Sequence, residues 1–83
     1  MKNFRRHAIG YVASMMWEAT TGYRPFSEVV RQFSTANERD GFEIEYIPRG
    51  LPRGNWLRIE GVRLTPEEME EAISRAKEVL EGN

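Results

Sequence analysis

The C-terminal part of the chain carries the clearest pattern of apolar and polar positions. Over residues 69–80, apolar side chains recur three or four positions apart and form one stripe, as on an amphipathic helix. A capping box precedes the stripe, with Thr65 as the N-cap, a proline directly after it and Glu68 three residues later. The pattern predicts a helix over residues 66–81, which Gly82 ends. The apolar stripe consists of Met69, Ala72, Ile73, Ala76, Val79 and Leu80.

Two further helices are predicted in the N-terminal half. Over residues 3–20 the apolar positions cover more than one stripe, which indicates a helix at the centre of the fold. A second, shorter helix is expected over residues 25–36, with Pro25 at its start. The apolar positions are Phe4, Ala8, Tyr11, Val12, Met15, Met16 and Ala19 in the first helix, and Phe26, Val29, Val30 and Phe33 in the second.

Between the second and the last helix the pattern changes to strict alternation. In residues 41–47 a phenylalanine, an isoleucine and a tyrosine alternate with two glutamates, which predicts a half-buried strand. Residues 55–61 repeat the alternation, and here we expect Leu57 and Ile59 to face the core. The side chains expected to face outward are Trp56, Arg58 and Glu60. The two runs predict an antiparallel hairpin.

The predicted order of elements is therefore α-α-β-β-α. This order indicates the α+β fold class, as a small single domain over residues 1–83 in which an antiparallel β-hairpin packs on three helices. A chain of this length buries only about 60–65% of its unfolded surface, so its stability margin is expected to be thin. The sequence has no cysteine, which excludes disulfides and thiolate metal ligands and fits a reducing compartment.

The N-terminus shares one feature with targeting segments: a basic start precedes an apolar run. Polar or small residues interrupt this run at helical spacing, and no cleavage motif of small residues follows it. The run is also too short to span a bilayer. We therefore expect a cytoplasmic protein that does not use a membrane as partner.

The charge is unevenly distributed although the net charge is only −1. Residues 1–63 hold ten basic against seven acidic side chains, whereas residues 64–83 hold two against six. Ten of the twelve basic residues are arginines. Arginine suits carboxylates, phosphates and interfaces, so this bias favours a binding role, although a GC-rich genome would produce the same bias.

The predicted hairpin loop contains Pro-Arg-Gly twice in succession, in residues 48–54. Each copy is typical of a type I turn, in which the arginine projects into solvent. Arg49 and Arg53 would then share one end of the hairpin with Trp56 and Arg58, and no acidic residue occurs between Tyr46 and Ile59. Either this end is a rigid, arginine-bearing binding surface, or the prolines and arginines only stiffen and solubilise a long loop.

The favoured hypothesis is a small, non-enzymatic binding protein that regulates or inhibits a larger protein partner. Arginine and tryptophan are frequent interface anchors, so the predicted partner-binding residues are Arg49, Arg53, Trp56 and Arg58. An inhibitor of nucleic-acid machinery of the phage or mobile-element type would combine these features.

The alternative is a nucleic-acid-binding domain. Helices followed by a hairpin resemble the winged-helix architecture in shape, with residues 48–55 as the wing and residues 25–36 as the recognition helix. Arg31, Gln32, Ser34 and Thr35 would form the exposed face of that helix. The acidic last helix and the negative net charge argue against this interpretation, because nucleic-acid-binding domains are usually strongly basic.

A second interface is predicted on the first helix. Three bulky residues follow each other at positions 15–17, and they cannot all face the core, so Met15 or Trp17 would contact a partner or a second copy in a homodimer. Gly10 and Ser14, four residues apart, would let another backbone approach closely.

The residues with catalytic potential are few. His7 is the only histidine, and we expect it at the surface. The glutamates near residues 67–71 are expected to form a solvated helix face. Tyr46, Arg58 and Glu60 are of the types that small ribonucleases use, but no histidine or lysine lies near them in the sequence. We therefore expect no enzyme activity, no metal site and no cofactor.

Overall fold

The structure, a computed structural model, describes residues 2–47 and 56–82. It contains three helices and one antiparallel pair of strands, in the predicted order α-α-β-β-α. The elements are α1 (Lys2–Ala19), α2 (Phe26–Arg39), β1 (Phe42–Tyr46), β2 (Leu57–Val62) and α3 (Pro66–Gly82). The α+β fold class, with a hairpin packed on helices, is therefore confirmed.

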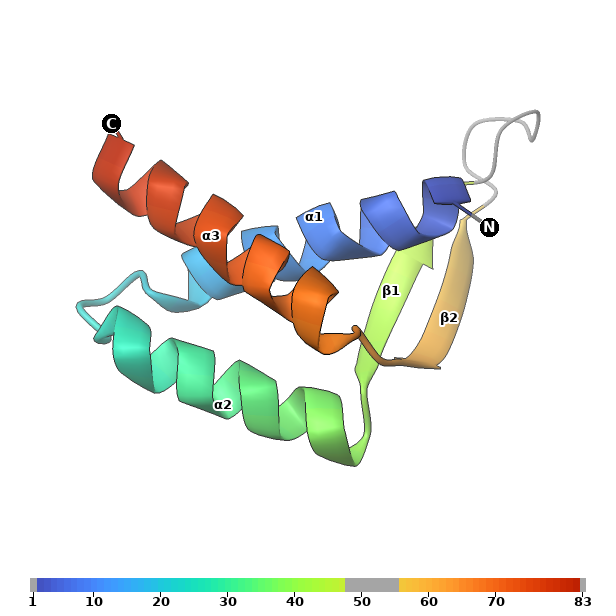
Figure 1. The fold of residues 1–83 in the computed structure, drawn as a ribbon, viewed down its shortest axis with the longest axis horizontal. Helices are drawn as coiled ribbons and strands as arrows, with labels where there is room; N and C mark the ends of the chain where they lie inside the picture. Colours follow the sequence, from blue (N-terminus) through green and yellow to red (C-terminus); the bar gives the residue numbers. More distant parts are fainter. Residues whose placement is uncertain (1, 48–55, 83) are drawn as a thin grey trace.

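Helix α1 is the central element, as its broad apolar surface predicts. Helix α3 crosses it, α2 lies along another side, and the hairpin packs near its N-terminal end (Figure 1). The turn between α1 and α2 and the C-terminus of α3 lie at the opposite end of the molecule (Figure 1). None of the described helices is both long enough and apolar enough to cross a membrane.

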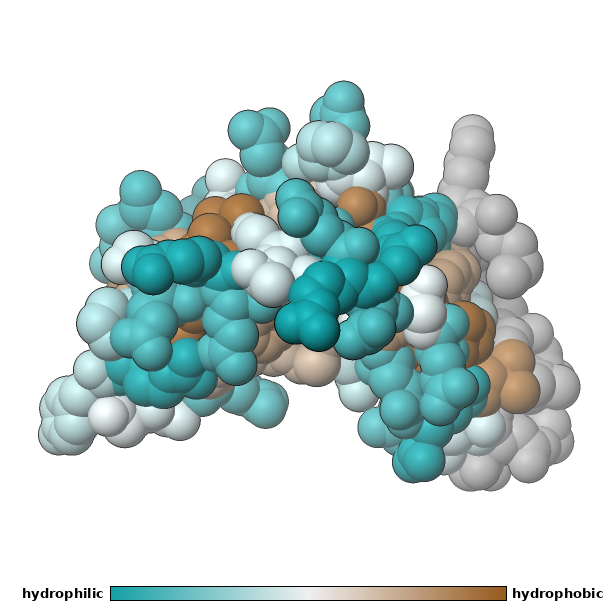
Figure 2. Space-filling model, turned by 90° about the horizontal axis from the view of Figure 1, so that it is seen from below, coloured by the Kyte–Doolittle hydropathy of each residue, from teal (hydrophilic) through white to brown (hydrophobic). Residues whose placement is uncertain are grey.

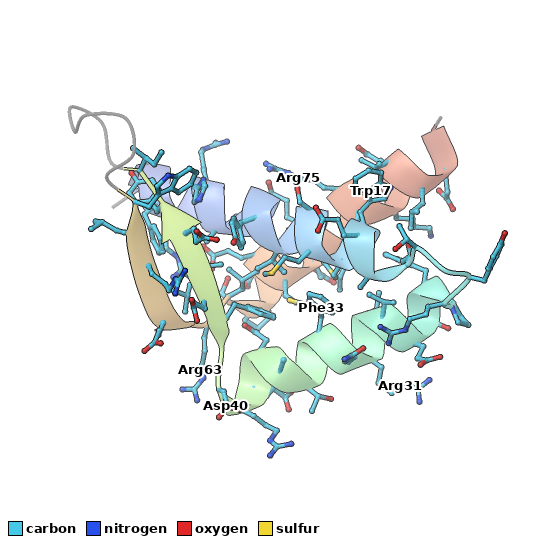
Figure 3. All side chains as sticks on the ribbon, turned by 180° about the vertical axis from the view of Figure 1, so that it is seen from behind. Trp17, Arg31, Phe33, Asp40, Arg63 and Arg75 are labelled. Carbon is cyan, nitrogen blue, oxygen red and sulfur yellow. The ribbon has the colours of Figure 1, made fainter. Side chains whose placement is uncertain are left out.

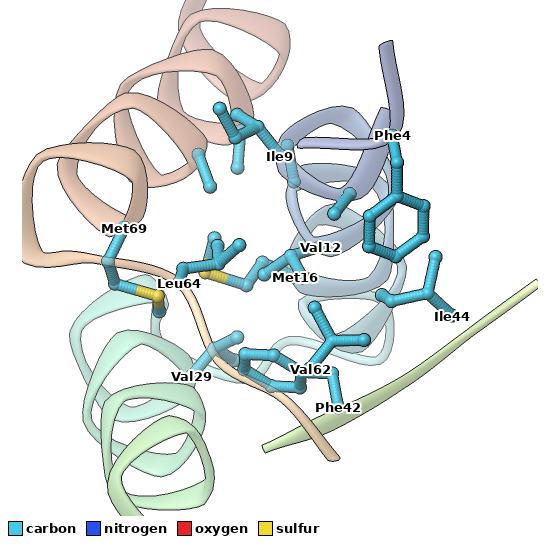
Figure 4. Packing of buried hydrophobic residues seen from close by; sticks show 14 residues of the cluster. Phe4, Ile9, Val12, Met16, Val29, Phe42, Ile44, Val62, Leu64 and Met69 are labelled. Atoms are coloured by element: carbon cyan, nitrogen blue, oxygen red, sulfur yellow. The ribbon is translucent and has the colours of Figure 1, made fainter. Parts of the chain in front are cut away.

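The core is formed where α1, α2, α3 and β1 meet. Its largest fully buried side chains are Val12 and Met16 of α1, Val29 of α2 and Ile44 of β1, which converge in Figure 4. Because side chains from four elements close this core, removing any one of them would leave a cavity that the others cannot easily fill.

The start of α3 forms the predicted capping box. The N–H of Thr65 donates to Oε1 of Glu68 at 2.9 Å, and the N–H of Glu68 donates to Oγ1 of Thr65 at 3.1 Å. The neighbouring glutamates are exposed, as expected, but Glu68 is half-buried, because Arg5 of α1 donates to it from Nε at 3.1 Å. The box therefore also connects α3 to α1.

Helix α2 extends three residues beyond its predicted end. The added residues have no apolar member after Ala36, so periodicity alone could not include them. Asn37 lies in this last turn and binds both backbone groups of Leu64, and the helix ends where the N–H of Gly41 donates to the carbonyl of Ala36 at 2.9 Å. Gly41 has φ of +76°, a conformation that favours glycine.

The strands confirm the predicted hairpin with two differences. Phe42 and Ile44 of β1 are buried as expected, but a bulge near Gly61 shifts the register, so that Val62 is buried opposite Phe42. Leu57 was predicted to face the core, and this is wrong: its exposed fraction is 45%. The reason is that β1 packs on α1 whereas β2 packs mainly on β1, so no helix covers this end of β2.

Candidate interaction surfaces

The end of the hairpin at the start of β2 exposes three side chains in succession. Trp56 is 59% exposed and Leu57 is 45% exposed. Arg58 follows them, and its Nε lies 2.9 Å from Oε1 of Glu43 on β1. Both partners of this ion pair are well exposed, at 67% and 46%, so the pair contributes little to stability and can exchange for another carboxylate.

Two of the predicted partner-binding residues lie outside the described residues. Arg49 and Arg53 belong to residues 48–55, as does the predicted wing, and their position relative to Trp56 stays a prediction. Of the predicted site, the described residues thus bring together Trp56 and Arg58. Leu57, which the alternating pattern had assigned to the core, is also exposed, on the opposite face of the strand.

His7 was expected at the surface, and this expectation is wrong. Its Nε2 lies 2.6 Å from the carbonyl oxygen of Glu45, and its ring packs beside those of Tyr11 and Tyr46, with ring centroids 5.7 and 5.1 Å away. The side chain is half-buried between α1 and β1. The four-residue spacing of His7 and Tyr11 indicates a shared helix face, but only the fold shows that β1 lies against that face.

Tyr11 forms the second link between α1 and β1. Its hydroxyl donates to Oε1 of Glu45 at 3.3 Å. Partial burial raises the pKa of Tyr11 above its ordinary value of 10, and the negative charge of Glu45 raises it further. His7 and Tyr11 together cover β1 along its side facing α1.

The three bulky residues near the C-terminal end of α1 divide as predicted. Met16 is fully buried, Met15 is half-buried and Trp17 is 43% exposed. Trp17 lines a small hollow of ≈ 210 Å³ between α1 and α3, together with Ala76 and Val79. Figure 3 shows Trp17 and Arg75 on the side of the molecule where α1 and α3 meet.

Two details of this hollow differ from the predictions made from the sequence. The neighbour of Gly10 is the side chain of Arg75 rather than another backbone: a Cβ added at Gly10 would lie 3.5 Å from Nη1 of Arg75. Val79 and Leu80, assigned to the apolar stripe of the last helix, are exposed. The last turns of α3 extend away from α2 in Figure 1, so only the first part of the stripe is covered.

Helix α2 presents a hydrophilic outer face, which dominates the view of Figure 2. Arg31, Gln32 and Thr35 are exposed as predicted, whereas Ser34 is half-buried. A shallow groove of ≈ 600 Å³ runs along this face. The basic residues that line the groove are Arg24, Arg31 and Arg39, and its acidic residues are Glu28 and Asp40.

Comparison of the chain with protein families, with curated proteins and with solved structures found no match.

The residues considered for catalysis do not converge. Tyr46 packs against Phe4 with ring centroids 5.2 Å apart, on the face of β1 that meets the helices, whereas Arg58 and Glu60 lie on the other face of the hairpin. In the described ranges, no three histidine, aspartate or glutamate side chains are grouped so that they could hold a metal ion.

Proposed function

We propose that this chain is a small binding protein that regulates or inhibits a larger protein partner through the end of its hairpin. The observation that carries the proposal is the exposure of Trp56 and of Arg58, two residues further on, which share one face of the hairpin end because strand side chains alternate. A single exposed apolar residue is ordinary, so the proposal depends on the tryptophan together with an arginine on the same face. Tryptophan and arginine also dominate the binding energy of many interfaces.

The charge of the hairpin end defines the kind of partner. Arg58 already holds a carboxylate, that of Glu43, in an exposed pair. A partner that presents a carboxylate beside an apolar pocket would replace Glu43 at Arg58 while it covers Trp56. If Arg49 and Arg53 reach the same end, they would strengthen the selection of an acidic partner.

The experiment that tests this proposal is affinity capture from the native host with tagged wild-type chain and tagged Trp56→Ala. We expect the captured protein to be lost with Trp56→Ala, since an anchor residue contributes about 2 kcal/mol or more, or roughly 30-fold in affinity. The matched control is Trp17→Ala, which removes the other exposed tryptophan at the opposite end of α1. Equal capture by wild type and Trp56→Ala would contradict the proposal.

A second candidate function is nucleic-acid binding, which the groove along α2 favours. Arg31 and Arg39 lie on α2 and Arg24 lies just before it, and all three line the same groove. The test is a titration of the protein with duplex and single-stranded DNA at several salt concentrations. Affinity that falls steeply with salt, and falls further in Arg31→Ala, would support this function over protein binding.

A further inference from the structure

The two outer edges of the hairpin differ. The outer edge of β1 is covered by α1, where His7 lies 2.6 Å from the carbonyl oxygen of Glu45. The outer edge of β2 has no such cover: across residues 2–47 and 56–82, no other element forms a backbone hydrogen bond with it. Figure 1 shows β2 as the outermost strand, on the side of β1 that faces away from the three helices. An open strand edge is a template for a further strand.

The position of the free backbone groups follows from the alternation of an antiparallel ladder. Glu45 lies opposite Arg58, and the carbonyl of Glu45 points towards α1 rather than towards β2. The N–H and C=O of Arg58 therefore point away from β1. Those of Glu60, which precedes the bulge near Gly61, do so as well. Ile59, between them, pairs with Ile44 and directs its backbone groups inward.

The side chains along this edge are complementary to themselves. When two copies of β2 run antiparallel with Ile59 opposite Ile59, Arg58 of each copy lies opposite Glu60 of the other. A shift by two residues in either direction places Arg58 opposite Arg58 or Glu60 opposite Glu60. A shift by one residue places the core-facing side chains of one copy beside the solvent-facing side chains of the other. Only the centred register combines matching faces with two opposite-charge pairs.

We propose that a second copy of this chain is the occupant of the edge, so that two hairpins form a four-stranded antiparallel sheet held by Arg58–Glu60 pairs between the copies. In this register Leu57, which is exposed in the single chain, lies at the level of Gly61, where the bulge ends the regular pairing and no side chain obstructs Leu57. Arg58 gives up only its exposed pair with Glu43, which contributes little.

The proposal goes beyond the proposed function and does not depend on it. The edge is only six residues long, so we expect the affinity between the copies to be low and the dimer to form only at high protein concentration. The antiparallel arrangement directs the two hairpin ends to opposite ends of the sheet. A dimer would thus present Trp56 twice, with Arg58 of each copy held by Glu60 of the other.

Reversing the charge at position 58 or at position 60 tests the register directly. The variants Arg58→Glu and Glu60→Arg each place like charges opposite each other in a dimer of themselves. We expect each variant alone to dimerise at least about tenfold more weakly than wild type, measured by analytical ultracentrifugation over a concentration series. In an equal mixture, the introduced glutamate of one variant lies opposite the introduced arginine of the other, and the unchanged Glu60 and Arg58 also face each other. We therefore expect the dimer to return on mixing.

Two further variants separate this interface from other effects. Glu43→Gln removes the intramolecular partner of Arg58, and we expect the dimer to be retained. The double variant with both exchanges is expected to dimerise with itself and not with wild type. A thermal melt of each variant confirms that it folds. The proposal is overturned if wild type stays monomeric at about millimolar concentration, if mixing fails to restore the dimer, or if Trp17→Ala alone abolishes it.

Discussion

Glu68 shows how a single residue can serve two elements. Its carboxylate accepts the N–H of Thr65 within α3 and the guanidinium of Arg5 from α1. Arg5 also donates from Nη2 to the carbonyl oxygen of Arg63 at 2.8 Å, so it fixes the start of α3 at two points. The hydrogen bond from Arg5 is the main cause that lowers the pKa of Glu68, and the capping bonds lower it further.

This arrangement predicts a pH dependence of stability. A carboxylate whose pKa is lowered by folding stabilises the protein above its ordinary pKa of 4.5, and this contribution is lost as the pH falls through the lower folded value. We expect Glu68→Gln to cost about 1 kcal/mol at pH 7 and almost nothing at about pH 2, where wild type has lost the contribution too. Urea unfolding at both pH values measures the difference.

The matched control for this prediction is Glu67→Gln. Glu67 lies in the same helical turn but is exposed. We expect its substitution to change the free energy of unfolding by no more than about 0.5 kcal/mol at either pH. The interpretation fails if both variants respond to pH alike.

One side-chain amide joins the last turn of α2 to the segment before α3. Nδ2 of Asn37 donates to the carbonyl of Leu64 at 3.0 Å, and the N–H of Leu64 donates to Oδ1 of Asn37 at 2.8 Å. The side chain thus pairs with the segment between β2 and α3 as a neighbouring strand would. This bond lies at the junction of three elements, where an unpaired backbone group would be costly.

We therefore expect Asn37→Ala to lower the free energy of unfolding by about 1–3 kcal/mol, although alanine is the better helix former. The substitution leaves both backbone groups of Leu64 without a protein partner. Thr35→Ala is the control, because Thr35 is exposed on the same helix and the change in helix propensity is similar. Thermal melts of the three proteins decide the point: equal melting temperatures for the two variants would contradict this role of Asn37.

At the scale of the whole molecule, most of the exposed large apolar side chains among the described residues lie at two places. One is the hairpin end with Trp56 and Leu57, and the other is the junction of α1 and α3 with Trp17 and Val79. The first adjoins residues 48–54 with their two predicted arginine turns. A small domain has little apolar surface to spare, so both places are candidates for contact with other molecules.

The double variant Arg49→Ala with Arg53→Ala tests the first place. We expect its melting to change little, since surface substitutions usually stay within about 0.5 kcal/mol. Binding to the captured partner should weaken by about 2 kcal/mol or more if either arginine is an anchor. Calorimetric titration measures the affinity. Normal binding by this variant, together with weakened binding by Trp17→Ala, would move the working surface to Met15 and Trp17.

Replacing both loop prolines by alanine provides the comparison for that experiment. Pro48→Ala with Pro52→Ala keeps the arginines and removes the local restraint on the backbone, so affinity should fall less than in the arginine variant. A larger loss of affinity in the proline variant than in the arginine variant would mean that the shape of the loop matters more than its charge.

Much of this fold could be predicted from local patterns. The capping box of Thr65 and Glu68, the alternation of Phe42 and Ile44, and the broad apolar surface of α1 each involve residues only a few positions apart. Such patterns determine the type and order of the elements, because helix and strand place side chains with fixed periods. Of the candidate site, the exposure of Trp56 followed from the same alternation.

The tertiary structure alone decided what lies against each face. Leu57 has the pattern of a core residue but is exposed because no helix covers its end of β2, and His7 has the pattern of a surface residue but is half-buried because β1 lies against it. The pairing of Arg5 with Glu68 joins residues 63 positions apart. The sequence by itself determined the elements through local spacing, whereas contacts, open edges and exposed patches depended on how distant segments meet in space.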